Sequence, residues 1–197
     1  MDVDVAVVTE TWLKDGPDLD SDLKDLELGA GLGSVVLNRP PNSHTGLSHG
    51  GVAIFYKKTI GSLTRINLPN PDNFEVLTTM ATLKGSARKL VVVAAYIPPN
   101  YPVPKARACL EYIENAVIDI RRRYRDPYVV VAGDFNQWEI DQALVVFHDV
   151  REVHVGPTRK DRAIDRIFCN MSRSITESGT RSRTKGRGTA LQRATIG

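Results

Sequence analysis

Residues 90–97 (LVVVAAYI) and 128–136 (YVVVAGDFN) decide how this chain folds. Each segment begins with a run of β-branched and small apolar residues, the composition of a strand that is buried on both faces. The first run stops at Pro98-Pro99-Asn100 and the second at Gly133-Asp134, and both stops are loop chemistry. The two segments therefore predict core strands that end in polar residues.

A helix is predicted between these two strands. Apolar residues recur there at steps of three, one and four, which is typical of one buried helical stripe. The stripe consists of Ala106, Cys109, Leu110, Ile113, Ala116, Val117, Ile120 and Tyr124. Pro104 suits the first turn, and the arginines at 121–123 and 125 suit the C-terminal end of the helix dipole. A second, shorter helix is predicted from Trp138 to Leu144.

Most of the other elements are predicted to be strands. Similar apolar runs occur at Val3–Val8, Val35–Leu37, Val52–Tyr56, Glu75–Leu83 and Ile164–Phe168. Because most neighbouring strands have no helix between them, a doubly wound parallel sheet is not expected. The pattern favours an α/β protein of the α+β kind, with two packed, mostly antiparallel β-sheets flanked by helices.

The composition is that of an ordinary globular domain. The chain has 197 residues, 42% hydrophobic and 25% charged, which excludes wholesale disorder and a collagen-like structure. Two cysteines cannot form a disulfide framework and show no zinc-ligand spacing, which fits a reducing, intracellular compartment. No apolar run approaches the ~18 residues of a membrane span, so no membrane partner is expected. Nor does any segment indicate an obligate protein partner.

The net charge of +3 conceals an uneven distribution. Residues 1–30 contain nine acidic residues and two lysines, whereas residues 171–197 contain six basic residues and one glutamate. The second segment is also rich in Ser, Thr and Gly, so residues 171–197 are predicted to be a basic, disordered tail. Contact of this tail with nucleic acid is the alternative.

Polar side chains follow several of the predicted strands. Glu10 follows the first strand, Tyr96 follows the run at 90–95, and Asp134 and Asn136 follow the run at 128–132. If these strand ends share one edge of the fold, they assemble an oxygen-rich set of side chains. Such a set suits Mg²⁺ or Mn²⁺ better than zinc.

These segments also carry a family resemblance. The motifs are VVTETWL (7–13), HGGVA (49–53), AYIPP (95–99), VAGDFN (131–136), and Pro157-Thr158 followed by AIDRI (163–167). Together they resemble the endonuclease/exonuclease/phosphatase superfamily, and most closely the apurinic-like endonuclease domain of non-LTR retrotransposon polyproteins. The resemblance implies a DNase I-like four-layer sandwich over residues 1–170, DNA as the partner, and a nuclear location.

The resemblance also assigns roles to residues. It implies that Glu10 holds the catalytic Mg²⁺ (or Mn²⁺), that Tyr96 contacts the scissile phosphate, and that Asp134 orients or deprotonates the attacking water. Asn136 would help to bind the phosphate or the metal ion. Thr158 and Asp165 would lie in the block that shapes the DNA-binding rim, with Asp165 as an orienting residue.

Two parts of the family pattern are missing from this sequence. The family begins with an asparagine-bearing strand and ends with a Ser-Asp-His triplet, and no histidine follows His154 here. The match is therefore interpreted as truncated at both ends, with impaired cleavage. The histidines His44, His49, His148 and His154 are predicted to be loop, surface or strand residues rather than catalytic ones.

Three functions remain open at this point. The first is metal-dependent DNA cleavage, and the second is a catalytically inactive DNA-binding or folded remnant. A phosphatase of the same superfamily, acting on inositol phosphates or sphingomyelin, ranks below both because no matching recognition loops are visible.

Overall fold

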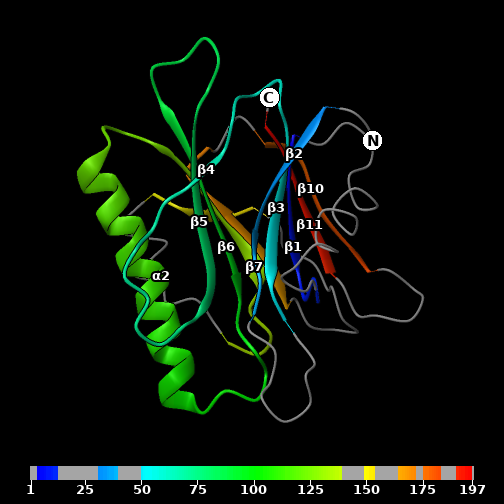
Figure 1. Ribbon diagram of the computed structural model, residues 1–197, viewed down its shortest axis with the longest axis vertical. Helices are drawn as coiled ribbons and strands as arrows, with labels where there is room; N and C mark the ends of the chain where they lie inside the picture. Colours follow the sequence, from blue (N-terminus) through cyan, green and yellow to red (C-terminus); the bar gives the residue numbers. More distant parts are fainter. Residues whose placement is uncertain are drawn as a thin grey trace.

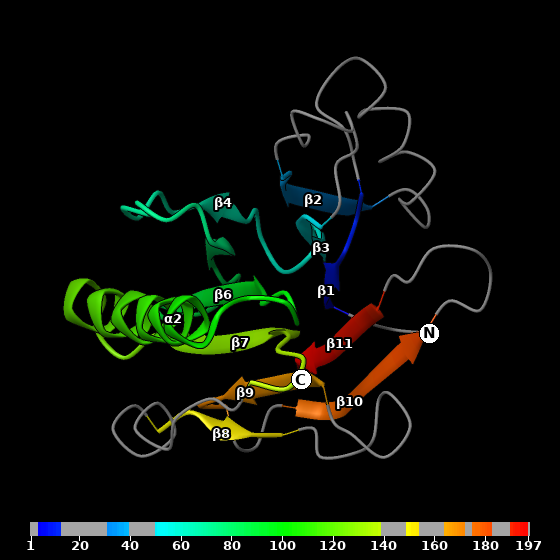
Figure 2. The same cartoon turned by 90° about the horizontal axis from the view of Figure 1, so that it is seen from below.

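The computed structural model describes most of the chain. The described residues are 4–12, 31–39, 50–138, 149–153 and 164–171, together with the backbone of residues 175–182 and 190–196. They form two β-sheets that pack face to face, with one long helix against the outer side of one sheet (Figures 1 and 2). This arrangement confirms the predicted fold class of packed, mostly antiparallel sheets.

The first sheet has five strands in the order β10-β11-β1-β3-β2. All of its pairings are antiparallel. Its strands are β1 (Val5–Thr9), β2 (Leu32–Leu37), β3 (Val52–Lys57), β10 (Ile175–Ser182) and β11 (Ala190–Ile196). The first three contain the apolar runs that predicted strands in these regions.

The second sheet has six strands in the order β4-β5-β6-β7-β9-β8. These are β4 (Thr64–Arg65), β5 (Glu75–Thr82), β6 (Lys89–Tyr96), β7 (Tyr128–Asp134), β8 (Arg151–Glu152) and β9 (Asp165–Cys169). Only β6 and β7 pair in parallel. A parallel pair needs a crossover connection, and α2 (Val103–Arg123) supplies it.

The predicted helical stripe is the buried face of α2. Ala106, Cys109, Ile113, Val117 and Ile120 are buried against the outer face of β6 and β7. Pro104 lies in the first turn, and Arg121–Arg123 occupy the last, as the sequence predicts. Burial raises the pKa of the Cys109 thiol to about 12, so this cysteine is a core residue and not a nucleophile.

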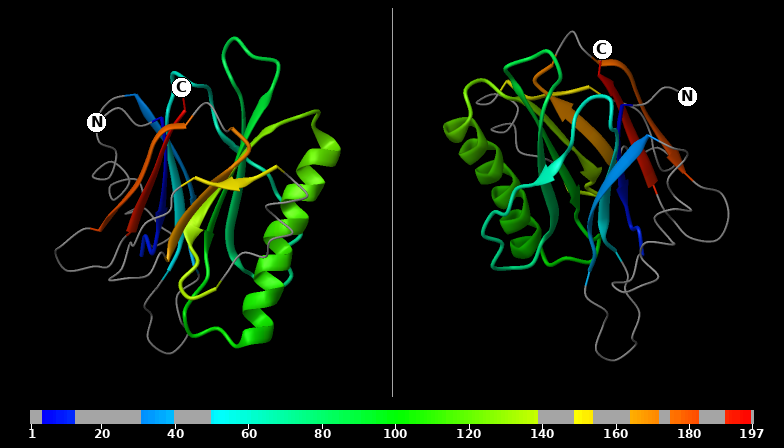
Figure 3. Two further views of the ribbon diagram at one scale, coloured as in Figure 1. Left: turned by 180° about the vertical axis from the view of Figure 1, so that it is seen from behind. Right: turned by 45° about the horizontal axis from the view of Figure 1, so that its top comes forward.

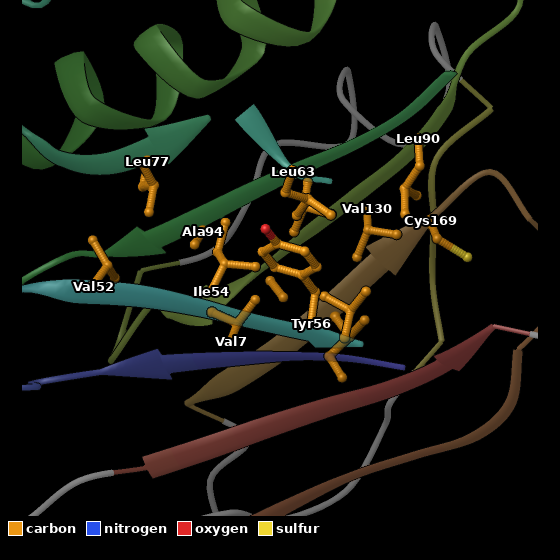
Figure 4. Packing of buried hydrophobic residues seen from close by; sticks show 14 of the residues in the cluster. Val7, Val52, Ile54, Tyr56, Leu63, Leu77, Leu90, Ala94, Val130 and Cys169 are labelled. Carbon is orange, nitrogen blue, oxygen red and sulfur yellow. The ribbon is translucent and has the colours of Figure 1, made fainter. Parts of the chain in front are cut away.

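The main core lies between the two sheets, because residues alternate between the faces of each strand. Val7, Ile54 and Tyr56 of the first sheet meet Ala94 and Val130 of the second (Figure 4). The residues between them on β6 and β7 point the other way, toward α2. Both faces of β6 and β7 are therefore apolar, as their continuous apolar runs predict.

The sequence predicts that residues 171–197 form a disordered tail, but the structure has two strands there, β10 and β11. Within this segment, β11 pairs with β1 and β10 pairs with β11, so the backbone of residues 175–182 and 190–196 extends the first sheet (Figure 3). Without β11, β1 would be an edge strand with unpaired backbone N–H and C=O groups. Main-chain pairing satisfies these groups and does not require an apolar composition, which is why the composition was misleading.

The short helix predicted from Trp138 to Leu144 falls largely outside the described residues. Among the helical segments that the structure describes, none has the length and apolar character needed to cross a membrane.

Candidate active site

The hydroxyl of Tyr96 connects the two sheets at one end of the sandwich. Tyr96 is the last residue of β6, and Glu10 directly follows β1, so each sheet contributes one side chain. The hydroxyl donates a hydrogen bond to Oε1 of Glu10 at 2.6 Å. Burial raises the pKa of Tyr96, and the bond to Glu10 and the nearby carboxylates raise it further. Tyr96 is therefore a neutral hydrogen-bond donor at physiological pH.

Four residues form one row across the six-stranded sheet. Strand pairing places Tyr96 opposite Glu75 on one side and opposite Asp134 on the other, and Asp134 opposite Asp165. Paired residues point to the same face of a sheet. The residues two positions away on each strand lie in the core between the sheets: Leu77, Ala94, Ala132 and Ile167. The row thus faces the sheet that supplies Glu10.

The three carboxylates of this row are largely shielded from solvent. The exposed fractions of Glu75, Asp134 and Asp165 are 5%, 7% and 3%. Buried carboxylates are costly unless hydrogen bonds or opposite charges compensate them. Such a concentration of acidic groups at one end of a sheet is therefore a candidate functional site.

The chain turns sharply after Asp134. The backbone N–H of Asn136 donates to Oδ1 of Asp134 at 2.8 Å, which fixes the orientation of that carboxylate. The Asn136 side-chain Nδ2 donates to the carbonyl of Ile97 at 3.0 Å, so the amide oxygen remains as the acceptor of this side chain. Asn136 has a φ of 50°, a conformation that asparagine adopts more readily than most residues.

Gly133 and Phe135 account for the rest of the Gly-Asp-Phe-Asn motif. A Cβ atom at Gly133 would overlap the carbonyl of Ala95 on the neighbouring strand, so only glycine fits there. Phe135 is fully buried and packs edge-on against Phe168, with the ring centroids 6.2 Å apart. The motif is thus a packed strand end that presents Asp134 and Asn136 at the site.

Glu75 has polar partners from segments next to two strands of the other sheet: Arg39 follows β2, and Gly51 precedes β3. Its Oε2 accepts a hydrogen bond from the backbone N–H of Gly51 at 2.5 Å, and its Oε1 lies 3.3 Å from Nη1 of Arg39. Burial raises the pKa of Glu75, and the charge of Glu10 acts in the same direction. The bond from Gly51 and the charge of Arg39 oppose this rise.

Sequence comparison decides the family of the chain. Residues 1–180 match the profile of the Endonuclease/Exonuclease/phosphatase family. The chain belongs to this family. Members of the endonuclease/exonuclease/phosphatase family are hydrolytic enzymes, so the site lies in a fold that supports hydrolysis. A comparison with curated protein sequences finds no match.

Solved structures with a similar fold agree with this family. Truncated TDP2 from Caenorhabditis elegans has a TM-score of 0.59 at 11% identity, covering 98% of this chain and 85% of that chain. The catalytic domain of human Nocturnin has a TM-score of 0.59 at 13% identity, covering 92% and 77%. The endonuclease domain of TRAS1, a telomere-specific non-LTR retrotransposon, has a TM-score of 0.54 at 14% identity, covering 92% and 93%. At these identities the likeness establishes the fold.

Enzymes of the endonuclease/exonuclease/phosphatase family generally use divalent metal ions, and the donor chemistry of this site fits one. Carboxylate oxygens come from Glu10 and Asp134, and an amide oxygen comes from Asn136. Within the described ranges, no three His, Cys, Asp or Glu side chains form a ligand cluster. Mg²⁺ does not need one, because it commonly keeps several waters and binds one or two carboxylates together with substrate phosphates.

The structure brings five of the predicted site residues to one end of the sandwich. These are Glu10, Tyr96, Asp134, Asn136 and Asp165. Their catalytic roles remain predictions. Thr158 and the four histidines lie outside the described residues.

Sequence reasoning missed Glu75 and Arg39. The available signal was an acidic residue at the start of a predicted strand, Glu75–Leu83, that has no other charged residue. That signal identifies a site residue only when the pairing of this strand with the Tyr96 strand is known.

Proposed function

We propose that this protein hydrolyses phosphodiester bonds in DNA with the help of Mg²⁺ or Mn²⁺, as an endonuclease of retrotransposon origin. One observation carries the proposal. Glu10 from one sheet meets Tyr96 of the other, in the row that continues through Asp134 and Asp165. This places a neutral donor beside carboxylates, which are the groups that phosphodiester hydrolysis requires.

Each residue has a role that follows from its chemistry. A bound metal ion would neutralise the charge that grows on the phosphate, and Glu10 would hold it. Asp134, oriented by the Asn136 N–H, accepts a proton from water while the water oxygen attacks phosphorus and the P–O bond to the leaving sugar breaks. On substrate binding, the Tyr96 hydroxyl would redirect its single hydrogen bond from Glu10 to a phosphate oxygen, and Asp165 would orient the groups beside it.

Two features support DNA as the substrate. The sequence motifs resemble the endonuclease domain of non-LTR retrotransposons, and the TRAS1 endonuclease domain shares the fold over 93% of its chain. Cationic side chains also lie near the acidic row. Arg39 pairs with Glu75 while 44% of its side chain stays exposed, and the exposed Lys105 acts electrostatically on Glu75. Exposed cations at such a rim favour contact with phosphates.

The test is nicking of supercoiled plasmid over long incubations, with Mg²⁺, with Mn²⁺ and with a chelator. The informative variants are Glu10→Gln and Asp134→Asn, which remove a charge and keep the shape of the side chain. Asp119→Asn is the matched control, since Asp119 is a partly exposed carboxylate on α2 whose contacts to Arg122 and Arg123 are long, 3.9 and 3.8 Å. We expect slow, metal-dependent nicking in the wild type and the control, in line with the impaired cleavage that the sequence predicts, and none in the two variants.

Other outcomes would contradict the proposal. Nicking that survives Asp134→Asn would assign it to a contaminant or to another site. A shift of DNA mobility without cleavage by any form would favour the DNA-binding remnant. Release of phosphate from small phosphomonoesters, in the absence of nicking, would favour a phosphatase.

A further inference from the structure

The backbone next to Glu10 is strained. Glu10 has a φ of 52° and Trp12 has a φ of 53°, the left-handed region that non-glycine residues seldom adopt. Residues in this region persist where their surroundings hold them, and they gather at functional sites. Because the Glu10 carboxylate depends on this backbone for its direction, whatever holds the strained segment also places the carboxylate.

Two hydrogen bonds hold that segment against the turn at Gly50 and Gly51. The N–H of Thr11 donates to the carbonyl of Gly51 at 3.3 Å, and the N–H of Trp12 donates to the carbonyl of Gly50 at 2.9 Å. The position of the strained segment therefore follows the position of the glycine turn.

Glu75 holds the glycine turn in place. Its Oε2 accepts a hydrogen bond from the N–H of Gly51 at 2.5 Å, and only 6% of this side chain on β5 is exposed to solvent. Glu75 stands opposite Tyr96 in the ladder, and Tyr96 bonds to Glu10. The contacts close a ring through Glu75, Gly51, Thr11, Glu10 and Tyr96, which links the two sheets at the site.

The two glycines are required by this ring. Gly50 and Gly51 have φ values of 107° and 89°. A Cβ atom at Gly50 would run into the Glu75 carboxylate, whose Oε1 would lie 2.9 Å away. A Cβ atom at Gly51 would lie 2.6 Å from Oγ1 of Thr11. The Gly-Gly pair at 50–51 thus has a physical reason: it lets the carboxylate reach the backbone of the turn.

We infer that Glu75 is a positioning residue, which holds the Gly50–Gly51 turn and through it the strained backbone of Glu10. The inference deepens the proposed function and rests on it for its metal-binding consequence. A group placed only for stability would not be a carboxylate buried near the charge of Glu10, since burial and that charge both work against its ionisation. Glu75 acts on the site through Gly51 and Thr11, not through contact with substrate.

Glu75→Asp and Glu75→Gln separate geometry from charge. Aspartate keeps the charge but is one methylene too short to reach Gly51, whereas glutamine keeps an oxygen acceptor at the same reach. Thr79→Val is the control, because Thr79 is buried on the same strand and its hydroxyl donates only to the carbonyl of Val92 at 3.3 Å. Thermal melting shows whether each variant folds.

Amide exchange measured by NMR in metal-free protein is the first readout. We expect at least tenfold faster exchange of the Gly51, Thr11 and Trp12 amides in Glu75→Asp, and wild-type exchange in Glu75→Gln and Thr79→Val. The second readout is the affinity for Mn²⁺ measured by electron paramagnetic resonance. We expect a loss of about tenfold in Glu75→Asp, the size typical of residues that orient a metal ligand, and recovery in Glu75→Gln.

The outcomes separate this inference from the proposed function. Wild-type exchange in Glu75→Asp would overturn the inference, and so would fast exchange in Glu75→Gln, because glutamine keeps the reach of the side chain and removes only its charge. If the exchange pattern is as expected but the wild type binds no Mn²⁺ and cuts no DNA, the proposed function fails while the backbone role of Glu75 stands. If Glu75→Asp does not fold, Glu75→Gln decides: fast exchange of the three amides in that variant overturns the inference, and wild-type exchange supports it.

Discussion

The two faces of the six-stranded sheet use the same strands in opposite ways. Toward α2, Val91, Val93, Val129 and Val131 are fully buried among apolar neighbours. Toward the other sheet the strands are equally apolar along most of their length, but they end in the acidic row with Tyr96. Apolar packing stabilises the fold, whereas a row of buried carboxylates opposes it. The helix-facing side is thus arranged for stability, and the end of the other side for chemistry.

Backbone conformation shows the same contrast. α2 and the strands beneath it are regular, and in the short loops that join them only Asp126 has a positive φ. At the acidic end, Glu10, Trp12 and Asn136 all adopt positive φ values, between 50° and 53°. Strain of this kind is tolerated where the surrounding core is strong enough to offset it. The apolar face therefore makes the strained end possible.

The largest effect is expected from Asp134→Asn. The variant should lower the nicking rate by about a thousandfold or more, because residues that act as one catalytic unit lose most of the rate when one is removed. Its melting temperature should stay equal or rise, since a buried negative charge is removed from beside Asp165. Nicking rates and thermal melts on the same preparation check the loss of activity and the unchanged or raised melting temperature. A variant that loses activity only because it unfolds would contradict the contrast between the two faces.

Ile113→Ala should lower stability and leave the nicking rate unchanged, the reverse of what is expected for Asp134→Asn. Ile113 lies on the buried face of α2, with 1% of its surface exposed. Removing most of a buried isoleucine should lower the free energy of unfolding by about 3 kcal/mol, through lost transfer energy and the cavity left behind. The nicking rate should be unchanged at temperatures where the variant is folded. Urea unfolding measures the first effect; a large loss of activity in folded protein would show that the helix face serves the site.

The fold was largely predictable because strand and helix periodicities are local. The valine runs at 90–97 and 128–132 and the stripe from Ala106 to Tyr124 each lie within one element, and each matches the structure. β10 and β11 were missed for a physical reason. Their pairing with β1 comes from backbone hydrogen bonds to a distant segment, and composition does not report such bonds.

The site was only partly predictable. Asp134 and Asn136 sit in a compact motif, and Glu10 and Tyr96 end apolar runs, so their residue types identify them. Glu75 is different, because its importance lies in its register against Tyr96 and in its bond to Gly51, 24 residues earlier in the chain. Register and long-range backbone contacts are set by tertiary packing, so one sequence alone does not reveal them.

Mg²⁺ should stabilise the folded protein by binding at the acidic end, so its effect should depend on Glu10 and not on the helix face. A ligand that binds only the folded protein raises the free energy of unfolding by about 1.4 kcal/mol when its concentration is tenfold above Kd. We expect a rise in melting temperature with Mg²⁺ at constant ionic strength, lost in Glu10→Gln and retained in Ile113→Ala. An equal rise in Glu10→Gln would place the ion elsewhere.

The smallest effect is expected in the pH dependence of stability, and it comes from Glu75. Burial raises the pKa of Glu75 above its ordinary value of 4.5 in the folded protein. Between the ordinary and the raised pKa, the folded protein holds a proton that the unfolded chain has already released. The free energy of unfolding should therefore fall as the pH rises through this interval, because the unfolded state binds fewer protons there. Glu75→Gln cannot ionise, so this part of the fall should disappear, while Thr79→Val should shift stability without changing its slope against pH. Urea unfolding of metal-free protein from pH 4 to pH 8 measures the slopes. An unchanged slope in Glu75→Gln would contradict this expectation. It would mean that Arg39 and the Gly51 N–H offset the burial of the carboxylate, so that the acidic end lowers the free energy of unfolding less than its charges suggest.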